Sequence, residues 1–204
     1  MSNKDSIKLN IGAGITYIPG FINIDLSEKA DISLNLNHDR LPFNDNCVDV
    51  VYSNHTLEHF DDYLFAIGEI HRVLKHGGKL LLSVPYLTLT QYNLVNPYHK
   101  QNFNEYSFDF FDPDKLLNSA AEDGQILYRK ICHRFTYLPD FANKPQEEKD
   151  WARRHYFNVV REIAFGVLAI KEKNSDLKIN SNISDQLLEE YDLYTASRIR
   201  HSTS

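Results

Sequence analysis

Two glycines and a carboxylate near the N-terminus have the types and spacing that a nucleoside-binding site needs. Residues 7–11 alternate between apolar and polar and stop at Gly12 and Gly14, and a second short apolar run, 21–26, carries Asp25 near its end. Glycines after a strand let a ligand approach the backbone closely. A carboxylate at the end of the next strand can accept two hydrogen bonds from a ribose diol. The pattern therefore predicts a nucleoside site at the carboxyl ends of two strands.

The connection between these two predicted strands is too short for a phosphate-binding helix. Only residues 13–20 separate the glycine turn from the second strand, and Pro19 and Gly20 occupy part of that stretch. A parallel crossover usually needs about a dozen residues, and a pyrophosphate is normally held at a helix N-terminus. A nucleoside with a short tail that lacks phosphate fits better. A nicotinamide-dependent sugar enzyme is therefore disfavoured.

Two histidines are candidates to remove a proton from an acceptor. His55 follows the predicted strand 47–52, and His99 lies in the long aperiodic stretch between Pro85 and Asn104. A histidine titrates near neutrality, so it can serve as a general base. For His99 the alternative is a surface histidine in a polar loop, and the two interpretations have equal weight.

A metal site is not expected from the histidine spacing. His55 and His59 are four residues apart with Glu58 between them, but the His-Glu-x-x-His order of a zinc helix is absent. Glu58 and His59 are interpreted instead as residues that brace the loop before a predicted helix.

The elements that must position these residues alternate between strands and helices. This alternation predicts an α/β fold with a doubly wound, mostly parallel sheet. The expected strands are 7–11, 21–26, 32–36, 47–52, 79–84, 125–133 and 163–171. The expected helices are 61–76, closed by Gly77, then 112–121, 146–156 and an amphipathic segment, 183–199.

Composition and charge exclude several other classes of protein. The 204 residues are 42% hydrophobic and 25% charged, which is ordinary for a soluble globular domain. A net charge of -6 with scattered basic residues makes nucleic acid a poor substrate. No apolar run is long enough to cross a bilayer, and the N-terminus is polar, so no signal peptide is expected. Two cysteines without metal-ligand spacing are typical of free thiols in a reducing compartment, and a cytoplasmic location is expected.

Several motifs in order resemble the class I S-adenosylmethionine-dependent methyltransferases. They are Leu-Asn-Ile-Gly-Ala-Gly at 9–14, Pro-Gly-Phe-Ile-Asn-Ile-Asp at 19–25, Leu-Pro-Phe at 41–43, Val-Asp-Val-Val at 48–51, Leu-Glu-His at 57–59 and Glu-Ile-His-Arg-Val-Leu-Lys-His-Gly-Gly at 69–78. The resemblance is strongest to the short-crossover branch found among small-molecule and glycan enzymes. It is strong over 7–85 and weaker to residue 170.

The resemblance implies a fold, a cofactor and a domain division. The fold is a Rossmann-like doubly wound seven-stranded sheet, mostly parallel with an antiparallel last strand. The cofactor is S-adenosylmethionine. Residues 1–173 would form the methyltransferase domain, and 174–204 a polar C-terminal extension. The amphipathic segment in this extension is expected to pack on the domain or on a partner such as a second copy of the chain.

Cofactor-binding residues are carried over by position. The resemblance places Gly12 and Gly14 beside the methionine part of the cofactor and Asp25 at the ribose hydroxyls. Asn10 stands where the family often has an acid for the amino group, and Asn35 replaces an aspartate at the adenine. Because of this replacement, the adenine contact is left open between Asn35 and two nearby residues, Asn37 and Asp39. The full expected set is Asn10, Gly12, Ala13, Gly14, Asp25, Leu26, Asn35, Leu36 and Asn54.

The expected activity is transfer of a methyl group to an oxygen or nitrogen of a small-molecule or carrier-linked acceptor, sugars included. Positioning and desolvation of the two reactants supply most of the acceleration in such a reaction. A hydroxyl acceptor also needs a base, for which His99 and His55 are the candidates, whereas an amine acceptor needs no strong base. The alternative function is a non-catalytic binding or regulatory protein that has the same fold.

Overall fold

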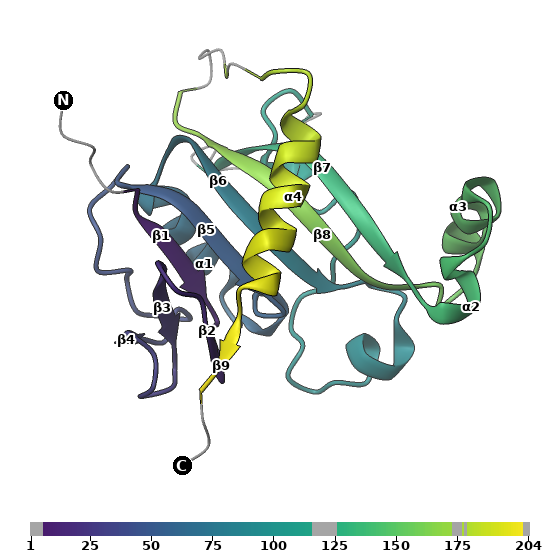
Figure 1. The fold of residues 1–204 in the computed structure, drawn as a ribbon, viewed down its shortest axis with the longest axis horizontal. Coiled ribbons are helices and arrows are strands. Elements are labelled where there is room, and N and C mark those ends of the chain that lie inside the picture. The colour runs from purple at the N-terminus through teal and green to yellow at the C-terminus, as the bar shows by residue number, and fades with distance from the viewer. Residues whose placement is uncertain (1–5, 116–125, 173–176, 178, 202–204) are drawn as a thin grey trace.

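A seven-stranded sheet forms the centre of the chain in the computed structural model, which describes residues 6–115, 126–172, 177 and 179–201 (Figure 1). Its strands lie in the order β4-β3-β1-β5-β6-β8-β7, and β8 runs antiparallel to both neighbours. This confirms the expected Rossmann-like α/β sheet with an antiparallel last strand. The strands are β1 (Lys8–Ile11), β3 (Ile22–Asp25), β4 (Ile32–Ser33), β5 (Val48–Asn54), β6 (Leu74–Pro85), β7 (Leu127–Tyr137) and β8 (Val160–Ile170).

The strand order reverses between β1 and β5. From β1 the chain moves outward through β3 to β4, then returns to pair β5 with the other side of β1. Leu9 is fully buried between Ile22 on one side and Val51 on the other. Ligands bind in the crevice at such a switch point, outside the carboxyl ends of the strands. The reversal therefore places the glycine turn after β1 beside the residues that follow β5.

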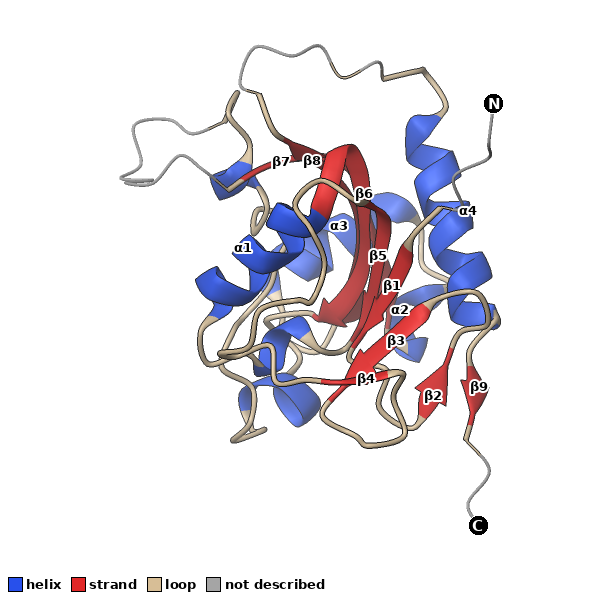
Figure 2. Cartoon of the chain, turned by 90° about the vertical axis from the view of Figure 1, so that its left-hand side faces the viewer, coloured by secondary structure: helices blue, strands red, loops and turns tan. Residues whose placement is uncertain are grey.

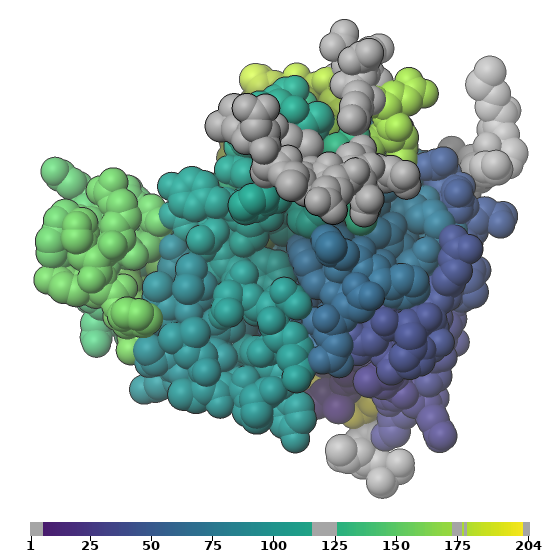
Figure 3. All heavy atoms as spheres, turned by 180° about the vertical axis from the view of Figure 1, so that it is seen from behind, coloured from purple at the N-terminus to yellow at the C-terminus, as the bar shows by residue number. Residues whose placement is uncertain are grey.

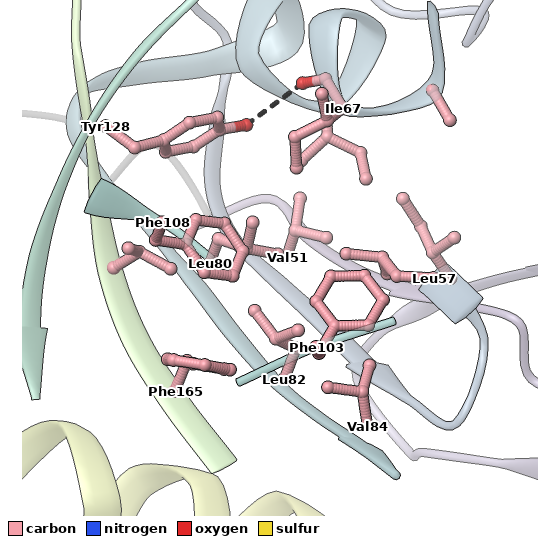
Figure 4. Packing of buried hydrophobic residues seen from close by; sticks show 14 of the residues in the cluster. Val51, Leu57, Ile67, Leu80, Leu82, Val84, Phe103, Phe108, Tyr128 and Phe165 are labelled. Atoms are coloured by element: carbon pink, nitrogen blue, oxygen red, sulfur yellow. Dashed lines mark hydrogen bonds between the residues drawn. The ribbon is translucent and has the colours of Figure 1, made fainter. Parts of the chain in front are cut away.

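Helices cover both faces of the sheet (Figure 2). Successive side chains of β6 point to opposite faces, so this strand contributes to the core on each side. Leu80 and Leu82 belong to the larger core on the side of α1 (Tyr63–Val73), whereas Leu81 belongs to a smaller core with α4 (Ile183–Ala196). In the larger core the Tyr128 hydroxyl donates a hydrogen bond of 3.1 Å to the Ile67 carbonyl oxygen of α1 (Figure 4). Both faces are buried, which accounts for the near-continuous apolar strands.

Helix α1 ends earlier than the sequence predicts. The Asp62 side chain accepts a hydrogen bond of 2.9 Å from the Phe65 backbone N–H and caps the helix start. The helix ends at Val73, however, and Leu74 is already extended and fully buried in β6. The prediction of a helix to residue 76 with Gly77 as its stop is therefore wrong. Pairing of Leu74 with Val48 in the sheet overrides the local helical signal.

The segment between β6 and β7 has little regular structure. A π-helical turn at Thr90–Leu94 and a 3₁₀ turn at Asp109–Phe111 lie within it. Residues 112–115 form a turn, and the rest of the helix predicted over 112–121 lies outside the described residues. From behind, this teal segment lies beside the blue surface that includes α1 (Figure 3). The long loop therefore covers the α1 side of the molecule, next to the carboxyl ends of the strands.

The last described segments return to the glycine crossover. Helix α4 packs with Leu187, Tyr191 and Tyr194 against the sheet. Beyond it, β9 (Ile199–Arg200) pairs antiparallel with β2 (Thr16–Tyr17), which lies in the short crossover after β1. Helices α2 (Pro139–Ala142) and α3 (Gln146–His155) project from the opposite edge (Figure 1). Across the described part of the chain, none of the helices has the length and apolarity to span a bilayer.

Candidate functional site

A cavity of about 470 Å³ opens at the switch point of the sheet. Its volume lies within the range of roughly 300–1,000 Å³ that is usual for small-molecule and cofactor sites. The residues around it come from the ends of β1, β3 and β5, from the segment after β4, and from the loop after β6. They are Ile11, Gly12, Gly14, Ile24, Asp25, Leu26, Leu34, Asn35, Leu36, Asn37, His55, Thr56, His59, Phe60, Asp61, Tyr98 and Lys100.

The glycine turn forms one wall of this cavity. Gly12 has a φ of +74°, and a Cβ atom there would lie 1.9 Å from the Thr56 Oγ1 atom. Gly14 has a φ of +60°, but nothing lies within 4 Å of the position of its Cβ. Position 12 therefore requires glycine both because of its left-handed backbone and because of its close contact with the loop after β5. Position 14 requires glycine because of its backbone alone. Residues 13–20 contain β2 and no helix, as the short crossover predicts.

Asp25 connects the end of β3 to the glycine turn. Its Oδ2 atom accepts a hydrogen bond of 2.8 Å from the Gly14 N–H, and its Oδ1 atom accepts one of 3.0 Å from the Ser27 N–H. Each carboxylate oxygen can accept a second hydrogen bond. The half-buried carboxylate at the cavity wall can therefore hold the turn and receive hydroxyl groups of a ligand.

The segment after β4 supplies a further wall. Asn35, Leu36 and Asn37 line the cavity, whereas Asp39 does not. The Asp39 carboxylate accepts a hydrogen bond of 3.0 Å from the Asn35 N–H, which fixes the turn. The Asn37 side-chain oxygen accepts a hydrogen bond of 2.8 Å from the Asp61 N–H. Of the two alternatives that the sequence left open beside Asn35, Asn37 is the one at the cavity.

Three residues of the predicted cofactor set lie outside the lining. Ala13 is buried, and Asn10 donates a hydrogen bond of 2.9 Å to the Asn23 side chain on β3. The Asn54 side-chain oxygen accepts a hydrogen bond of 3.2 Å from the Tyr191 hydroxyl of α4. The other six, Gly12, Gly14, Asp25, Leu26, Asn35 and Leu36, all line the cavity.

A second cavity of about 400 Å³ adjoins the first and shares His55 and His59 with it. Both predicted acceptor-side histidines, His55 and His99, therefore line this second cavity. The full lining is His55, Glu58, His59, Pro85, Leu89, Tyr92, Asn96, His99, Arg161 and Glu162.

His55 lies between two carboxylates. Its φ of +52° is in the left-handed region, which is uncommon for a residue with a side chain. Its Nε2 atom is 2.8 Å from Oε2 of Glu162, and its Nδ1 atom is 3.6 Å from Oε1 of Glu58. Burial by itself lowers the pKa of His55, but these two partners outweigh burial and raise the pKa to about 9. The imidazole is therefore protonated at neutral pH.

His99 has the opposite electrostatic setting. Its Nδ1 atom lies 3.0 Å from the side-chain oxygen of Asn93, and its ring packs edge-on against His59 at 4.6 Å between centroids. Burial lowers the pKa of His99, and the negative charge of Glu58 offsets this only in part. The ring is therefore neutral at pH 7 and keeps a lone pair.

Several lining residues, Thr56 and Lys100 among them, were not predicted from the sequence. Tyr98 and Lys100 reach the first cavity because the Lys100 and Gln101 backbone N–H groups donate hydrogen bonds of 2.7 and 3.1 Å to the Glu58 carbonyl oxygen. No local pattern marks this long-range contact. Thr56 could have been inferred from the glycine turn only once β1 and β5 were known to be neighbours.

Fold and site together define a class of protein. Glycines with left-handed backbones, a carboxylate after the second parallel strand and an adjoining cavity at the switch point are the arrangement of an α/β protein that binds a nucleoside cofactor. The sequence over 13–82 matches the family model of a methyltransferase domain. A comparison with curated proteins gives no match.

Solved structures of similar fold come from several organisms. A methyltransferase from Archaeoglobus fulgidus that depends on S-adenosylmethionine superposes with a TM-score of 0.57 at 14% identity, over 81% of this chain and 86% of that one. A Haloferax volcanii protein described as a methyltransferase, in complex with the Trm112 methyltransferase activator, gives 0.54 at 14%, over 84% and 85%. A Listeria monocytogenes protein described as an S-adenosylmethionine-dependent methyltransferase gives 0.50 at 12%, over 81% and 90%. At these identities the likeness shows the fold.

The family match and the fold lead to one assignment. Residues 13–82 match the methyltransferase domain family, and the chain has the fold of S-adenosylmethionine-dependent methyltransferases. Together these findings support a class I methyltransferase that uses S-adenosylmethionine as its cofactor. The residues present fit this cofactor, because the glycine turn leaves the wall beside Gly14 open and Asp25 supplies hydroxyl acceptors there.

Proposed function

We propose that this methyltransferase modifies an oxygen or nitrogen of a small-molecule or carrier-linked acceptor, sugars among them, that binds in the second cavity. The observation that carries the proposal is the junction of the two cavities at His55 and His59. An acceptor in the second cavity would meet a cofactor in the first at this junction. Positioning two reactants in this way supplies much of the acceleration in a bimolecular transfer.

The cofactor side of the proposal uses the residues at the carboxyl ends of the strands. S-adenosylmethionine supplies an activated methyl group when it is bound. Asp25 accepts the ribose hydroxyls, Gly12 and Gly14 leave room for the methionine part, and Asn35 with Leu36 holds the adenine. Asn10, Ala13 and Asn54 support this wall from behind, through buried contacts. Residues 1–173 form the methyltransferase domain in this proposal, and 174–204 its C-terminal extension.

The acceptor side of the proposal depends on the second cavity. His99 and His55 both line it, so both are within reach of an acceptor. The Tyr92 side chain, 67% exposed, lies at the same wall and offers a ring face to a sugar. Of the two histidines predicted as the base, His99 keeps a free lone pair at neutral pH, whereas His55 is protonated there. The role of base at either histidine stays a prediction.

Replacing Asp25 with alanine tests the cofactor side. The variant should bind S-adenosylmethionine and its demethylated product about 1.5–3 kcal/mol more weakly, the scale for a hydrogen bond to a charged group. Isothermal titration calorimetry measures the change. Glu28→Ala, on the same connection but outside the cavity lining, is the matched control and should bind normally. Unchanged affinity in Asp25→Ala would remove Asp25 from the site.

Replacing His99 with alanine tests the acceptor side. Turnover should fall about a hundredfold or more, the range for loss of a group that assists proton removal. Affinity for S-adenosylmethionine should remain nearly normal, because His99 lines only the second cavity. His55→Ala is the comparison, since His55 lines both cavities and its loss should weaken cofactor binding as well. Normal turnover in both variants would mean that the base lies elsewhere or that the acceptor is an amine.

The acceptor itself requires a direct assay. Purified protein should transfer a methyl group to at least one member of a panel of nucleotide sugars, glycans and amines, with the product detected as a mass increase of one methylene. Product formed with a nucleic acid and with none of these acceptors would overturn the proposal.

A further inference from the structure

Glu58 is a buried carboxylate without a full set of partners. Its side chain is 1% exposed, and its Oε2 atom has no hydrogen-bond partner among the described residues. Its other oxygen, Oε1, is 3.6 Å from Nδ1 of His55 and 3.8 Å from Nε2 of His59. An ionised carboxylate out of water costs several kcal/mol unless it is paired or coordinates a cation. A buried, half-satisfied carboxylate at a cavity wall therefore points to a cationic ligand.

Two histidines gather around this carboxylate from different parts of the chain. His59 ends the 3₁₀ turn Leu57–His59, and His99 lies in the long loop after β6. One ligand atom from each of Glu58, His59 and His99 lies within 4.8 Å of the others. The hydrogen bonds from Lys100 and the next residue to the Glu58 carbonyl hold the loop in this place.

The neighbours of the two histidines fix which ring nitrogen carries the proton. Nδ1 of His59 is 3.2 Å from the Tyr98 carbonyl oxygen, which can only accept, so Nδ1 donates. Nδ1 of His99 is 3.0 Å from Oδ1 of Asn93. The Asn93 amide nitrogen donates to the Asn102 side-chain oxygen at 2.8 Å, which sets the orientation of the amide, so Nδ1 of His99 also donates. Each histidine therefore keeps its lone pair on Nε2.

From this geometry we propose that Glu58, His59 and His99 form a binding site for a divalent transition-metal ion of the zinc type. Two imidazoles and one carboxylate are a common ligand set for such an ion, and they leave a fourth position open. Hydrogen bonds from the other ring nitrogen to carbonyl groups are the usual second contacts of metal-binding histidines. In a tetrahedral site with bonds of about 2.0–2.1 Å, ligand atoms lie about 3.3 Å apart, so the side chains must close by up to about 1.5 Å.

The open position would lie at the second cavity, which all three ligands line. In that respect the inference rests on the proposed function, since the group that would meet the ion is the acceptor. Coordination through Nε2 also uses the lone pair that a base would need. In this arrangement His99 is a metal ligand, and a group other than a histidine can act as the base.

Zinc titration of the whole, chelator-treated chain tests the site. Calorimetry should show saturable binding of one Zn²⁺ per chain. His59→Ala and His99→Ala should each weaken binding about a hundredfold, and Asn93→Ala about 10–100-fold because it releases the orientation of His99. The His59 side chain is 42% exposed, so its variant should keep the fold even if Glu58→Gln does not. His38→Ala, which removes an exposed histidine paired with Asp39 outside both cavities, is the control.

Two results would overturn the metal site. One is no saturable Zn²⁺ binding to the wild-type chain, and the other is equal affinity in the wild type, His59→Ala and His99→Ala. Binding of S-adenosylmethionine and methyl transfer are measured on the same chelator-treated samples. Absence of saturable Zn²⁺ binding in a chain that still binds S-adenosylmethionine would contradict only this inference. Zinc binding at the three residues in a protein that binds no S-adenosylmethionine would contradict only the proposed function.

Discussion

Replacing Gly12 with alanine is expected to destabilise the chain by about 3–5 kcal/mol and to abolish stabilisation by S-adenosylmethionine. The added Cβ atom would lie 1.9 Å from Oγ1 of Thr56, and the φ of +74° disfavours any residue with a side chain. Left-handed strain and overpacking each cost about 1–3 kcal/mol. To relieve the overlap, the glycine turn must separate from the loop after β5, and the two segments line the same cavity. Urea unfolding with and without S-adenosylmethionine measures both effects.

Two further variants separate the contact from the backbone strain. Gly20→Ala has a similar φ of +79° but nothing within 4 Å of the new Cβ, so it should cost only about 1–2 kcal/mol. Thr56→Gly in the Gly12→Ala background removes the clashing side chain and should restore part of the lost stability. If Gly12→Ala unfolds at the same urea concentration as Gly20→Ala, the close contact between Gly12 and Thr56 does not exist.

Replacing Arg72 with methionine is the second change with a large expected effect, a loss of about 3–5 kcal/mol of unfolding free energy. Its Nε atom donates to Oε1 of Glu69 and its Nη2 atom to Oε2, both at 2.8 Å. The same guanidinium donates to the carbonyl oxygens of Phe43 and Leu41 at 2.8 and 2.9 Å. Methionine leaves the buried Glu69 carboxylate and these carbonyl groups without that donor. Urea unfolding gives the difference.

Arg40 provides a matched control on the same carboxylate. Its Nε atom lies 3.3 Å from Oε1 of Glu69, but its side chain is 68% exposed. Arg40→Met should therefore cost about 1 kcal/mol or less. Glu69→Gln combined with Arg72→Met should be less damaging than the sum of the single changes, because the uncompensated charge is gone. Equal effects of Arg72→Met and Arg40→Met would show that the loop before β5 is not anchored through Arg72.

Local sequence patterns were sufficient for the frame of the site. The alternation of 7–11, the turn at Gly12 and Gly14, and the carboxylate of Asp25 are each visible within a few residues, and all three lie where the pattern predicts. The seven strands of the main sheet and its one antiparallel strand were also predicted, whereas the short antiparallel pair of β2 and β9 was not. These features depend on side-chain period and backbone conformation, which neighbouring residues determine.

The sequence was less informative about which way a side chain at a strand end points. Asn10 and Asn54 are at the predicted positions, yet their amides bond to β3 and to α4 instead of lining the cavity. Successive residues of a strand face opposite sides of the sheet. A residue that a sequence pattern places at the ligand can therefore point to the other face of the sheet. For Asn54, the packing of α4 shows that it does.

The sequence by itself thus determined the class of fold, the glycine turn and the carboxylate at the end of β3, because each is encoded locally. Only the tertiary structure brought His99 and Lys100 from the loop after β6 to Glu58, buried that carboxylate beside His59, and joined the two cavities. Contacts between segments some 40 residues apart depend on closing an irregular loop. No periodicity records where such a loop returns, so the second cavity became visible only in the folded chain.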